Sequence, residues 1–204
     1  MLQIAFEERQ RFVQTQQTWE RAARDPMALS RREWLILGSV GAAAAIGGAM
    51  LAPTLLRQDG GASELLAASL PDLSGQKRHL VEWKGRVVLC NFWATWCAPC
   101  REEIPMLNAL RGEFSRFGFE VVGIAVDNAA KVKEYAKKYR ISYPILIAEA
   151  DGLDLMRRLG NTAGALPFTV VLGRNSRILS RKLGILRKPE ITLEIKTLVS
   201  ESAD

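Results

Sequence analysis

The stretch Val87-Val88-Leu89-Cys90-Asn91-Phe92-Trp93-Ala94-Thr95-Trp96-Cys97-Ala98-Pro99-Cys100 places a pair of cysteines directly after an apolar run. A near-continuous run of this kind is typical of a central strand buried on both faces. Behind the pair, apolar side chains recur at helical spacing, at Ile104, Leu107, Leu110 and Phe114. We therefore expect a strand over 87–93 and a helix over 99–117, with the two cysteines where the helix begins.

This position suits Cys97 and Cys100 to redox chemistry. The first turn of a helix presents unpaired backbone N–H groups and a partial positive charge, which favour a thiolate. Cysteine pKa values there fall from about 8.5 to roughly 3.5–7.5. We expect Cys97, at the helix entry, to be the attacking thiolate and Cys100, one turn further, to resolve the mixed disulfide. Pro99 fits the first turn because its missing N–H would have no partner there.

The chain contains three cysteines and one histidine, His79. That number is too small for a disulfide scaffold and for a structural zinc site, which needs four Cys or His ligands. We therefore expect no metal and no cofactor. Cys90 lies inside the central strand, where a buried apolar thiol is expected.

Strands and helices continue to alternate after the cysteine pair. We expect strands at 77–83, 119–126, 144–148, 168–172 and 178–183, and helices at 131–139, 153–159 and 191–199. This order predicts an α/β fold with a mixed sheet that ends in a hairpin. The domain is expected over 71–200, after a linker at 57–70 that contains Gly60 and Gly61.

The stretch 34–56 has no charged residue, and as a helix it would span about 35 Å, enough for a bilayer core of about 30 Å. Arg31 and Arg32 precede it and resemble a twin-arginine export signal; alternatively, they hold the cytoplasmic end of a span. Both alternatives make 1–33 a cytoplasmic lead-in and place the residues beyond 57 on the periplasmic side, anchored or released by cleavage. Met27 would begin a more ordinary basic region, so residues 1–26 are hypothesised to be an upstream mis-start.

The formal net charge of the chain is +6. Between 174 and 188 there are cations and no acid, at Arg174, Arg177, Arg181, Lys182, Arg187 and Lys188. A solvated hairpin is the first interpretation of this stretch, and docking to an acidic partner or to lipid headgroups is the second. No aromatic-interleaved basic motif accompanies the charge, so we expect no nucleic-acid partner.

The segment from Asn91 to Pro105 resembles the active-site segment of the TlpA/ResA-like branch of the thioredoxin superfamily, and the similarity extends from about Pro71 to Val199. The resemblance implies a thioredoxin-like fold, a mixed central sheet flanked by helices. It also implies an extracytoplasmic thiol:disulfide oxidoreductase, often tethered, with a redox disulfide between Cys97 and Cys100. Its partners would be disulfide-bearing proteins, such as cytochrome c or metal-site proteins, and an upstream electron donor in the membrane.

Single positions also match that branch. Glu103 matches a glutamate used for proton transfer, with a solvated helix face as the alternative, and Pro105 matches a proline that kinks the helix. Pro167 matches a cis-proline that faces the cysteines, and Leu166 would offer its backbone to a substrate strand. The implied substrate-binding residues are thus Trp96, Pro99, Leu166 and Pro167. Asn91 departs from cytoplasmic thioredoxins, which have a buried aspartate there, so an acid at this position cannot be the base.

Three activities remain open for the pair. The dipeptide between the cysteines adds no cation or histidine that would lower the pKa of the thiol further, which favours a thioredoxin-like reductant. A thiol peroxidase would need a proline ahead of the cysteine, and the segment Phe92 to Trp96 has none. A copper-binding or copper-delivery module would usually add a histidine or methionine ligand, and His79 is the only histidine.

Overall fold

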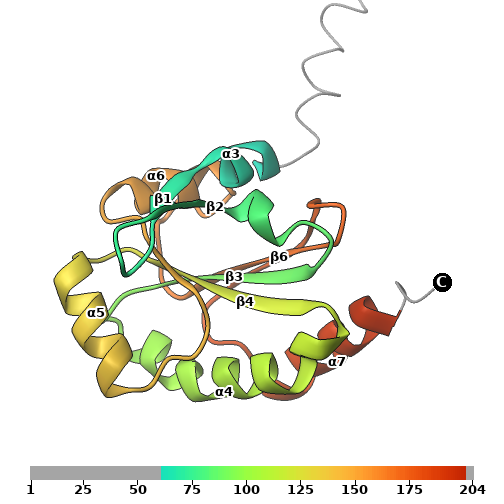
Figure 1. The fold of residues 1–204 in the computed structure, drawn as a ribbon. Helices are drawn as coiled ribbons and strands as arrows, with labels where there is room; N and C mark the ends of the chain where they lie inside the picture. Colours follow the sequence, from blue (N-terminus) through green and yellow to red (C-terminus); the bar gives the residue numbers. More distant parts are fainter. Residues whose placement is uncertain (1–60, 201–204) are drawn as a thin grey trace, which may run out of the picture. The chain divides into compact units, whose positions relative to one another are not determined.

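The computed structural model describes residues 61–200, which form a mixed five-stranded sheet covered by helices (Figure 1). The strand order is β5-β4-β3-β6-β7. β3 runs parallel to β4, β4 runs parallel to β5, and β6 is antiparallel to both of its neighbours. The strands are β3 (Val87–Trp93), β4 (Phe119–Ala125), β5 (Ile145–Ile147), β6 (Phe168–Leu172) and β7 (Ile178–Leu183). The thioredoxin-like α/β fold is thereby confirmed.

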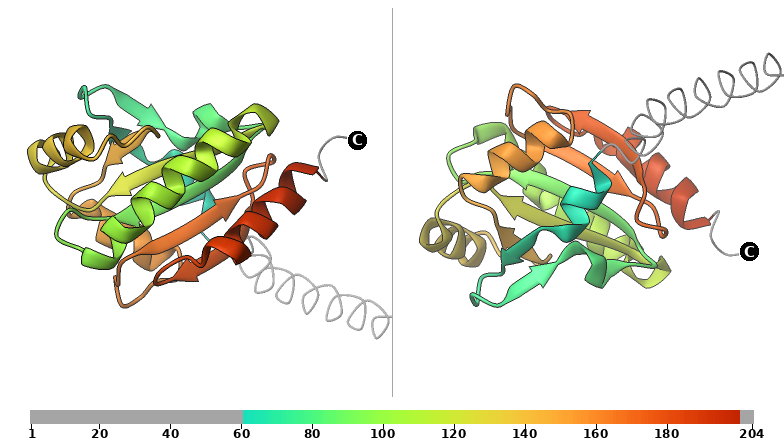
Figure 2. Two further views of the ribbon diagram at one scale, coloured as in Figure 1. Left: turned by 90° about the horizontal axis from the view of Figure 1, so that it is seen from below. Right: turned by 90° about the horizontal axis from the view of Figure 1, so that it is seen from above.

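Helices cover the two faces of this sheet unequally. The helices α4 (Ala98–Phe114) and α7 (Lys188–Ser200) lie on one face (Figure 2, left). The other face carries shorter elements (Figure 2, right): α3 (Ala62–Ala67), α6 (Asp151–Arg158), the strand pair β1 (Ser69–Pro71) and β2 (Lys77–His79), and a 3-10 helix, Leu80–Trp83. A second 3-10 helix, Ser115–Phe117, follows α4, and α5 (Ala129–Lys138) comes after β4.

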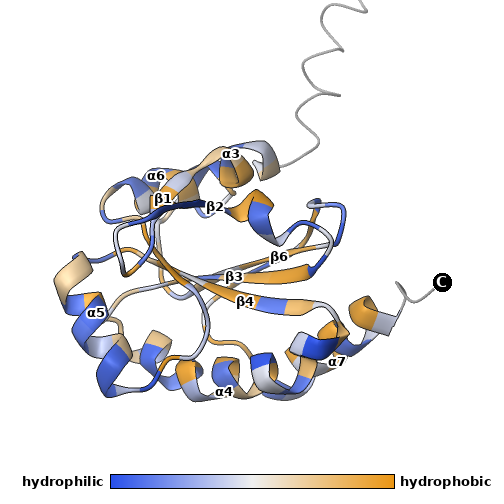
Figure 3. Cartoon of the chain, viewed as in Figure 1, coloured by the Kyte–Doolittle hydropathy of each residue, from blue (hydrophilic) through white to orange (hydrophobic). Residues whose placement is uncertain are grey.

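Every residue of β3 and of β4 is buried, and both strands are mostly apolar (Figure 3). Alternate side chains of β3 enter two separate cores. Leu89 and Trp93 pack in the core under α4 and α7, and Cys90 and Phe92 pack in the core under α3 and α6. The sequence pattern of a strand buried on both faces is therefore correct, because each face has its own helical cover.

Two expectations about the edge of the domain are wrong. The segment expected as a linker contains α3 and β1 in its described part, 61–70, and Leu65 of α3 is fully buried. The strand expected over 77–83 ends at His79, and a 3-10 helix follows because the Glu82 carboxylate accepts the His79 backbone N–H at 2.7 Å. The predicted segments 1–33 and 34–56 lie outside the described residues. Within 61–200, no helix is both long and apolar enough to cross a membrane.

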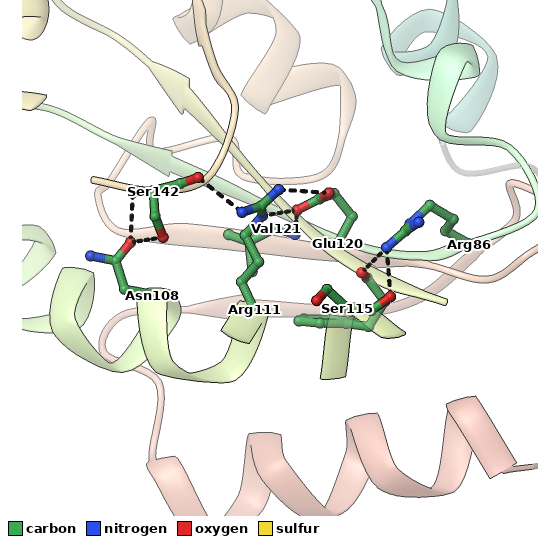
Figure 4. A network of polar contacts seen from close by, with 8 residues as sticks. Arg86, Asn108, Arg111, Ser115, Glu120, Val121 and Ser142 are labelled. Atoms are coloured by element: carbon green, nitrogen blue, oxygen red, sulfur yellow. Dashed lines mark hydrogen bonds and ion pairs between the residues drawn. The ribbon is translucent and has the colours of Figure 1, made fainter. Parts of the chain in front are cut away.

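A polar network fixes α4 to the sheet at the end remote from the cysteines (Figure 4). The Arg111 Nε group donates to Glu120 Oε1 of β4 at 2.5 Å, and Arg111 also reaches the Ser142 carbonyl at 3.0 Å. Nearby, the Arg86 guanidinium donates to the carbonyls of Ser115 and Phe119. The Glu120 carboxylate is buried, where a charge without a partner is unfavourable. The Arg111 guanidinium supplies the positive partner.

The cations between 174 and 188 are largely engaged within the domain. The Arg174 guanidinium donates to the Gly85 and Phe117 carbonyls, both at 3.0 Å. Lys182 pairs with Glu194 at 2.9 Å, and Arg187 pairs with Glu190 at 2.6 Å. The contacts of Arg174 and Lys182 connect the hairpin to neighbouring elements, whereas the Arg187–Glu190 pair is exposed at the start of α7.

Candidate active site

Cys97 stands at the entry to α4, as the sequence predicts. It is the N-cap residue of this helix, and the backbone N–H of Cys100 points to its Sγ at 3.3 Å. The two cysteines form a disulfide with their Cα atoms 5.3 Å apart. Pro99 lies in the first turn, where it removes no helical hydrogen bond. In the reduced protein, the same N–H and the positive end of the helix would stabilise a Cys97 thiolate.

The two cysteines differ in access. Cys100 is fully buried, whereas Cys97 keeps 5% of its surface exposed. Beside Cys97, the Trp96 side chain is 67% exposed, an unusual environment for an indole. Trp96 borders a surface hollow of about 540 Å³, together with Val126, Asp127, Asn128, Glu149, Ala150 and Leu153.

The peptide bond between Leu166 and Pro167 is cis, as the resemblance implies. Phe92 of β3 pairs with Phe168 of β6, so Pro167 lies at the edge of the sheet where β3 ends and the loop to Cys97 begins. Leu166 packs against the same core cluster that contains both cysteines. The structure thus places Trp96, Pro99, Leu166 and Pro167 at the cysteine end of the sheet.

Glu103 is buried, with 2% of its surface exposed, so the alternative of a solvated helix face is wrong. Its carboxylate accepts hydrogen bonds from Asn91 Nδ2 at 3.2 Å and from the Leu186 backbone N–H at 2.5 Å. Burial raises the pKa of Glu103, and these two hydrogen bonds oppose the rise only in part. Glu102, the preceding residue, is exposed.

The surroundings of Glu103 are polar but contain no cation paired with it within residues 61–200. Asn91 Nδ2 also donates to Thr169 Oγ1 at 3.1 Å, which connects β3 and β6 behind the active-site helix. Asn91 Oδ1, Trp93 Nε1 and the Tyr143 hydroxyl are buried and have no hydrogen-bond partner in the described part of the chain. Burial raises the pKa of Tyr143, and the charge of Glu103 adds to that rise. The acid is thus placed in an environment that favours its neutral form.

The sequence analysis missed Asp127, which holds the loop before Cys97. One carboxylate oxygen of Asp127 accepts both the backbone N–H of Thr95, at 3.0 Å, and the Thr95 hydroxyl. Burial alone would raise the pKa of Asp127. Hydrogen bonds from Thr95 and Asn128 lower it by more, so the pKa of this carboxyl lies below its ordinary value. The available signal was its position after a buried parallel strand, because functional groups gather at the carboxyl ends of such strands.

No cluster of three or more His, Cys, Asp or Glu side chains suited to a metal ion occurs within 61–200.

Comparison with known proteins agrees with this geometry. Residues 63–192 match the AhpC/TSA family. The chain belongs to this family. Within the AhpC/TSA family, the chain is similar to the thiol-disulfide oxidoreductase ResA of Geobacillus thermodenitrificans, with 28% identity over 130 residues, 63% of this chain and 72% of ResA. It is 35% identical over 127 residues to the thioredoxin-like protein YneN of Bacillus subtilis. The matched region covers 60% of this chain and 71% of YneN.

A solved structure supports the same assignment. The thioredoxin family thiol:disulfide interchange protein of Chlorobium tepidum superposes with a TM-score of 0.56 and 28% identity, over 65% of this chain and 92% of that protein. The resemblance to the TlpA/ResA-like branch is thereby confirmed. This member of the AhpC/TSA family is a thiol:disulfide oxidoreductase with a thioredoxin-type Cys97–Cys100 pair.

Proposed function

We propose that this chain is an extracytoplasmic reductant of protein disulfides, with Cys97 as nucleophile and Cys100 as resolving thiol. One observation carries the proposal. Cys97, the more exposed of the pair, occupies the N-cap of α4 and receives the Cys100 N–H, so it has the environment of an activated thiolate.

Two exchange steps complete the reaction. The Cys97 thiolate attacks one sulfur of the substrate disulfide, that S–S bond breaks, and the other substrate sulfur leaves as a thiolate that takes up a proton. Cys100 then loses its proton and attacks Cys97 Sγ, which forms the Cys97–Cys100 disulfide and releases the second substrate thiolate, also protonated. The substrate gains two electrons from the cysteine pair and two protons, one that Cys100 gives up and one from solvent, which took up the Cys97 proton when the thiolate formed.

Glu103 is the proposed acceptor of the Cys100 proton. It follows Cys100 by three residues on α4, so both side chains lie on the same face of the helix. A base works best when its pKa lies near the working pH, and burial moves the pKa of Glu103 in that direction.

The substrate strand is proposed to lie along Leu166 and Pro167, with Trp96 and Pro99 bordering the approach to Cys97. Pro167 has no backbone N–H, and Leu166 is only half-buried, so its backbone can meet an extended segment of the partner. The proposed substrates are cysteines of cytochrome c or of metal sites, which must be reduced before haem or metal attachment.

The proposed site of action is the periplasmic side of the cytoplasmic membrane. The uncharged stretch 34–56 and the preceding Arg31 and Arg32 support export, either as an anchored or as a cleaved form. Each turnover leaves the pair oxidised, so a dithiol donor in the membrane must return two electrons to it. Labelling of Cys97 by a membrane-impermeant thiol reagent in intact cells, after mild reduction, tests this location.

The decisive measurement is the reduction potential of the Cys97–Cys100 couple in the full chain. The potential of a reductant should lie near that of thioredoxin, about −270 mV. A potential near that of DsbA, about −120 mV, would overturn the proposed direction of electron transfer. In cells, Cys100→Ser should accumulate mixed disulfides on Cys97, and Cys97→Ser should not. Peroxide consumption that survives Cys100→Ser, or stoichiometric Cu(I) binding lost in Cys97→Ser, would support the peroxidase or the copper module instead.

A further inference from the structure

A second hollow is lined by residues of α4, including the neighbour of Cys97, and by tyrosines of α5 and its C-cap. Its volume is about 480 Å³, enough to hold a few side chains. Ala98, the first residue of α4 and the neighbour of Cys97, belongs to its wall. The remaining lining comes from both helices, which lie near each other in Figure 1: Arg101, Glu102, Ile104, Pro105, Tyr135 and Tyr139.

One wall of this hollow is aromatic and ordered before any ligand arrives. The rings of Tyr135 and Tyr139 stack with centroids 4.2 Å apart, and Tyr135 also meets the fully buried Trp93 at 5.7 Å. Tyr139 remains 47% exposed. An exposed aromatic surface that is already fixed loses little conformational freedom on binding, so it suits an apolar or aromatic side chain of a partner.

The hollow is also surrounded by cations without carboxylate partners. Lys131 and Tyr135 are four residues apart on α5, so they share one face, and Lys138 lies over the Tyr139 ring at 5.5 Å. Arg101 reaches in from α4. Within the part of the chain that the structure describes, no ion pair forms at Arg101, at Arg140 or at the exposed lysines of α5: Lys131, Lys133, Lys137 and Lys138.

This charge differs from that of the hairpin between 174 and 188, where Arg174, Lys182 and Arg187 are engaged within the domain. Acids also lie beside these cations: Glu102 and Glu134 are exposed and form no ion pair within residues 61–200, and Asp127, which accepts hydrogen bonds from Thr95, has its pKa lowered in part by Lys131. The cations that form no ion pair within the described residues outnumber these acids, and they adjoin the hollow beside the nucleophile.

We propose that this hollow and the cations of α5 dock an acidic segment of the substrate protein, one that also carries an aromatic or aliphatic side chain for the tyrosine wall. The inference rests on the proposed reduction of protein disulfides. A protein segment fits better than a lipid surface, because the site is concave and adjoins the sulfur that must meet a protein disulfide. Opposite charge would orient the substrate and speed its encounter with Cys97, an effect that salt weakens.

The test uses the reduced full chain in detergent and two unstructured peptides, each with one intramolecular disulfide and one tyrosine. One peptide carries Asp and Glu beside the disulfide and the other carries Lys. Each reaction oxidises the cysteine pair once, so the second-order rate constant of peptide reduction is measured. We expect this constant to be at least about tenfold higher for the acidic peptide at low salt, and the preference to shrink when the salt is raised to about 0.5 M. The double variant Lys131→Glu/Lys138→Glu should lose the preference. Lys196→Glu, which makes one such replacement on α7, should keep it.

Reduction of the neutral probe 2,2′-dithiodipyridine by the wild-type chain separates the two proposals. If this probe is reduced but both peptides react equally, the docking inference is overturned and the proposed function stands. If neither the probe nor the peptides are reduced, the proposed function fails. Binding of phosphatidylglycerol vesicles that is lost in the double variant, without any peptide preference, would assign the cations to a lipid surface and also overturn the inference.

Discussion

Asn91 Nδ2 donates a hydrogen bond to the Glu103 carboxylate at 3.2 Å and so joins the strand before Cys97 to the helix that follows it. The bond connects a neutral amide to a buried acid, and in the described domain no cation pairs with that acid. An amide can donate to the carboxylate without adding a second negative charge, which an aspartate at position 91 could not do. Asn91 therefore orients Glu103 and favours its carboxylate form, the form that can accept a proton.

The raised pKa of Glu103 predicts a particular pH dependence of stability. The folded protein holds this proton to a higher pH than the unfolded chain does, where the pKa of glutamate is about 4.3. The free energy of unfolding should therefore fall as pH rises from about 4.3 through the raised pKa, and level off above it. Glu103→Gln carries no such proton and should lack this component.

Urea unfolding of wild type and Glu103→Gln, scanned from about pH 4 to pH 8, measures this pH dependence of the unfolding free energy. The difference in unfolding free energy, wild type minus variant, should decrease over this range. Glu102→Gln removes a carboxylate from the exposed neighbouring position and should retain the wild-type profile. A difference that stays constant or increases with pH would contradict the prediction.

Cys90 should be chemically silent in the folded protein. It is fully buried in β3, and burial raises the pKa of its thiol. In the oxidised protein it is the free cysteine of the described domain. Iodoacetamide should add no group to the oxidised native chain and one group, at Cys90, in denaturant, as measured by intact mass. Cys90→Ala should show no addition in either state, and rapid labelling of the native protein would argue for an exposed or mobile β3.

The sequence predicts the centre of this fold better than its margin. The apolar run of β3 and the spacing of α4 dictate burial directly, so the strand, the helix and the cysteine pair between them could be located. The edge depends on local polar contacts. Asn128 Oδ1 accepts the Ala130 N–H and starts α5 two residues earlier than the apolar spacing indicates, and Leu65 gives no periodic signal in the short helix α3.

The candidate site divides in the same way. Cys97, Cys100 and Pro167 could be identified because motif and resemblance coincide on them. The environment of Glu103 could not, because its partners Asn91 and Leu186 are distant in the sequence and meet only in the folded sheet. Likewise, the count of cations between 174 and 188 could not show that several of them are engaged, whereas the lysines of α5 form no ion pair within residues 61–200.

Loss of Arg111 should destabilise the domain without changing its redox chemistry. Arg111→Met leaves the buried Glu120 carboxylate without the guanidinium that now lies 2.5 Å away, at a cost of about 3 kcal/mol. The additional change Glu120→Gln should recover part of this loss, because it removes the unpaired charge. The pair, drawn in Figure 4, lies near the C-terminal end of α4, whereas Cys97 caps its N-terminal end, so the reduction potential should remain that of wild type. A stability change below about 0.5 kcal/mol, the range of ordinary surface substitutions, would contradict this role.

Asp127 and Thr95 should be energetically coupled, and the coupling should affect the attack by Cys97. The Asp127 carboxylate accepts two hydrogen bonds from Thr95, one from the backbone and one from the hydroxyl. Thr95→Val removes the hydroxyl alone, and Asp127→Ala removes the oxygen that accepts both hydrogen bonds. Because hydrogen bonds to charged groups contribute about 1.5–3 kcal/mol, a double-mutant cycle should give a coupling energy of about 1–2 kcal/mol.

The same cycle has a pH signature and a kinetic one. The pKa of Asp127 is lowered in the folded protein, so the stabilisation is present above the unfolded value of about 3.9 and is lost as pH falls below it. Since Asp127 holds the loop that ends at Cys97, Asp127→Ala should slow the reaction of reduced Cys97 with dithiodipyridine several-fold. Asp127→Asn keeps an acceptor oxygen and should slow it less. Two results together would contradict the prediction: additive effects of Thr95→Val and Asp127→Ala on the unfolding free energy at neutral pH, and an unchanged rate of the Cys97 reaction. They would show that other residues position the loop.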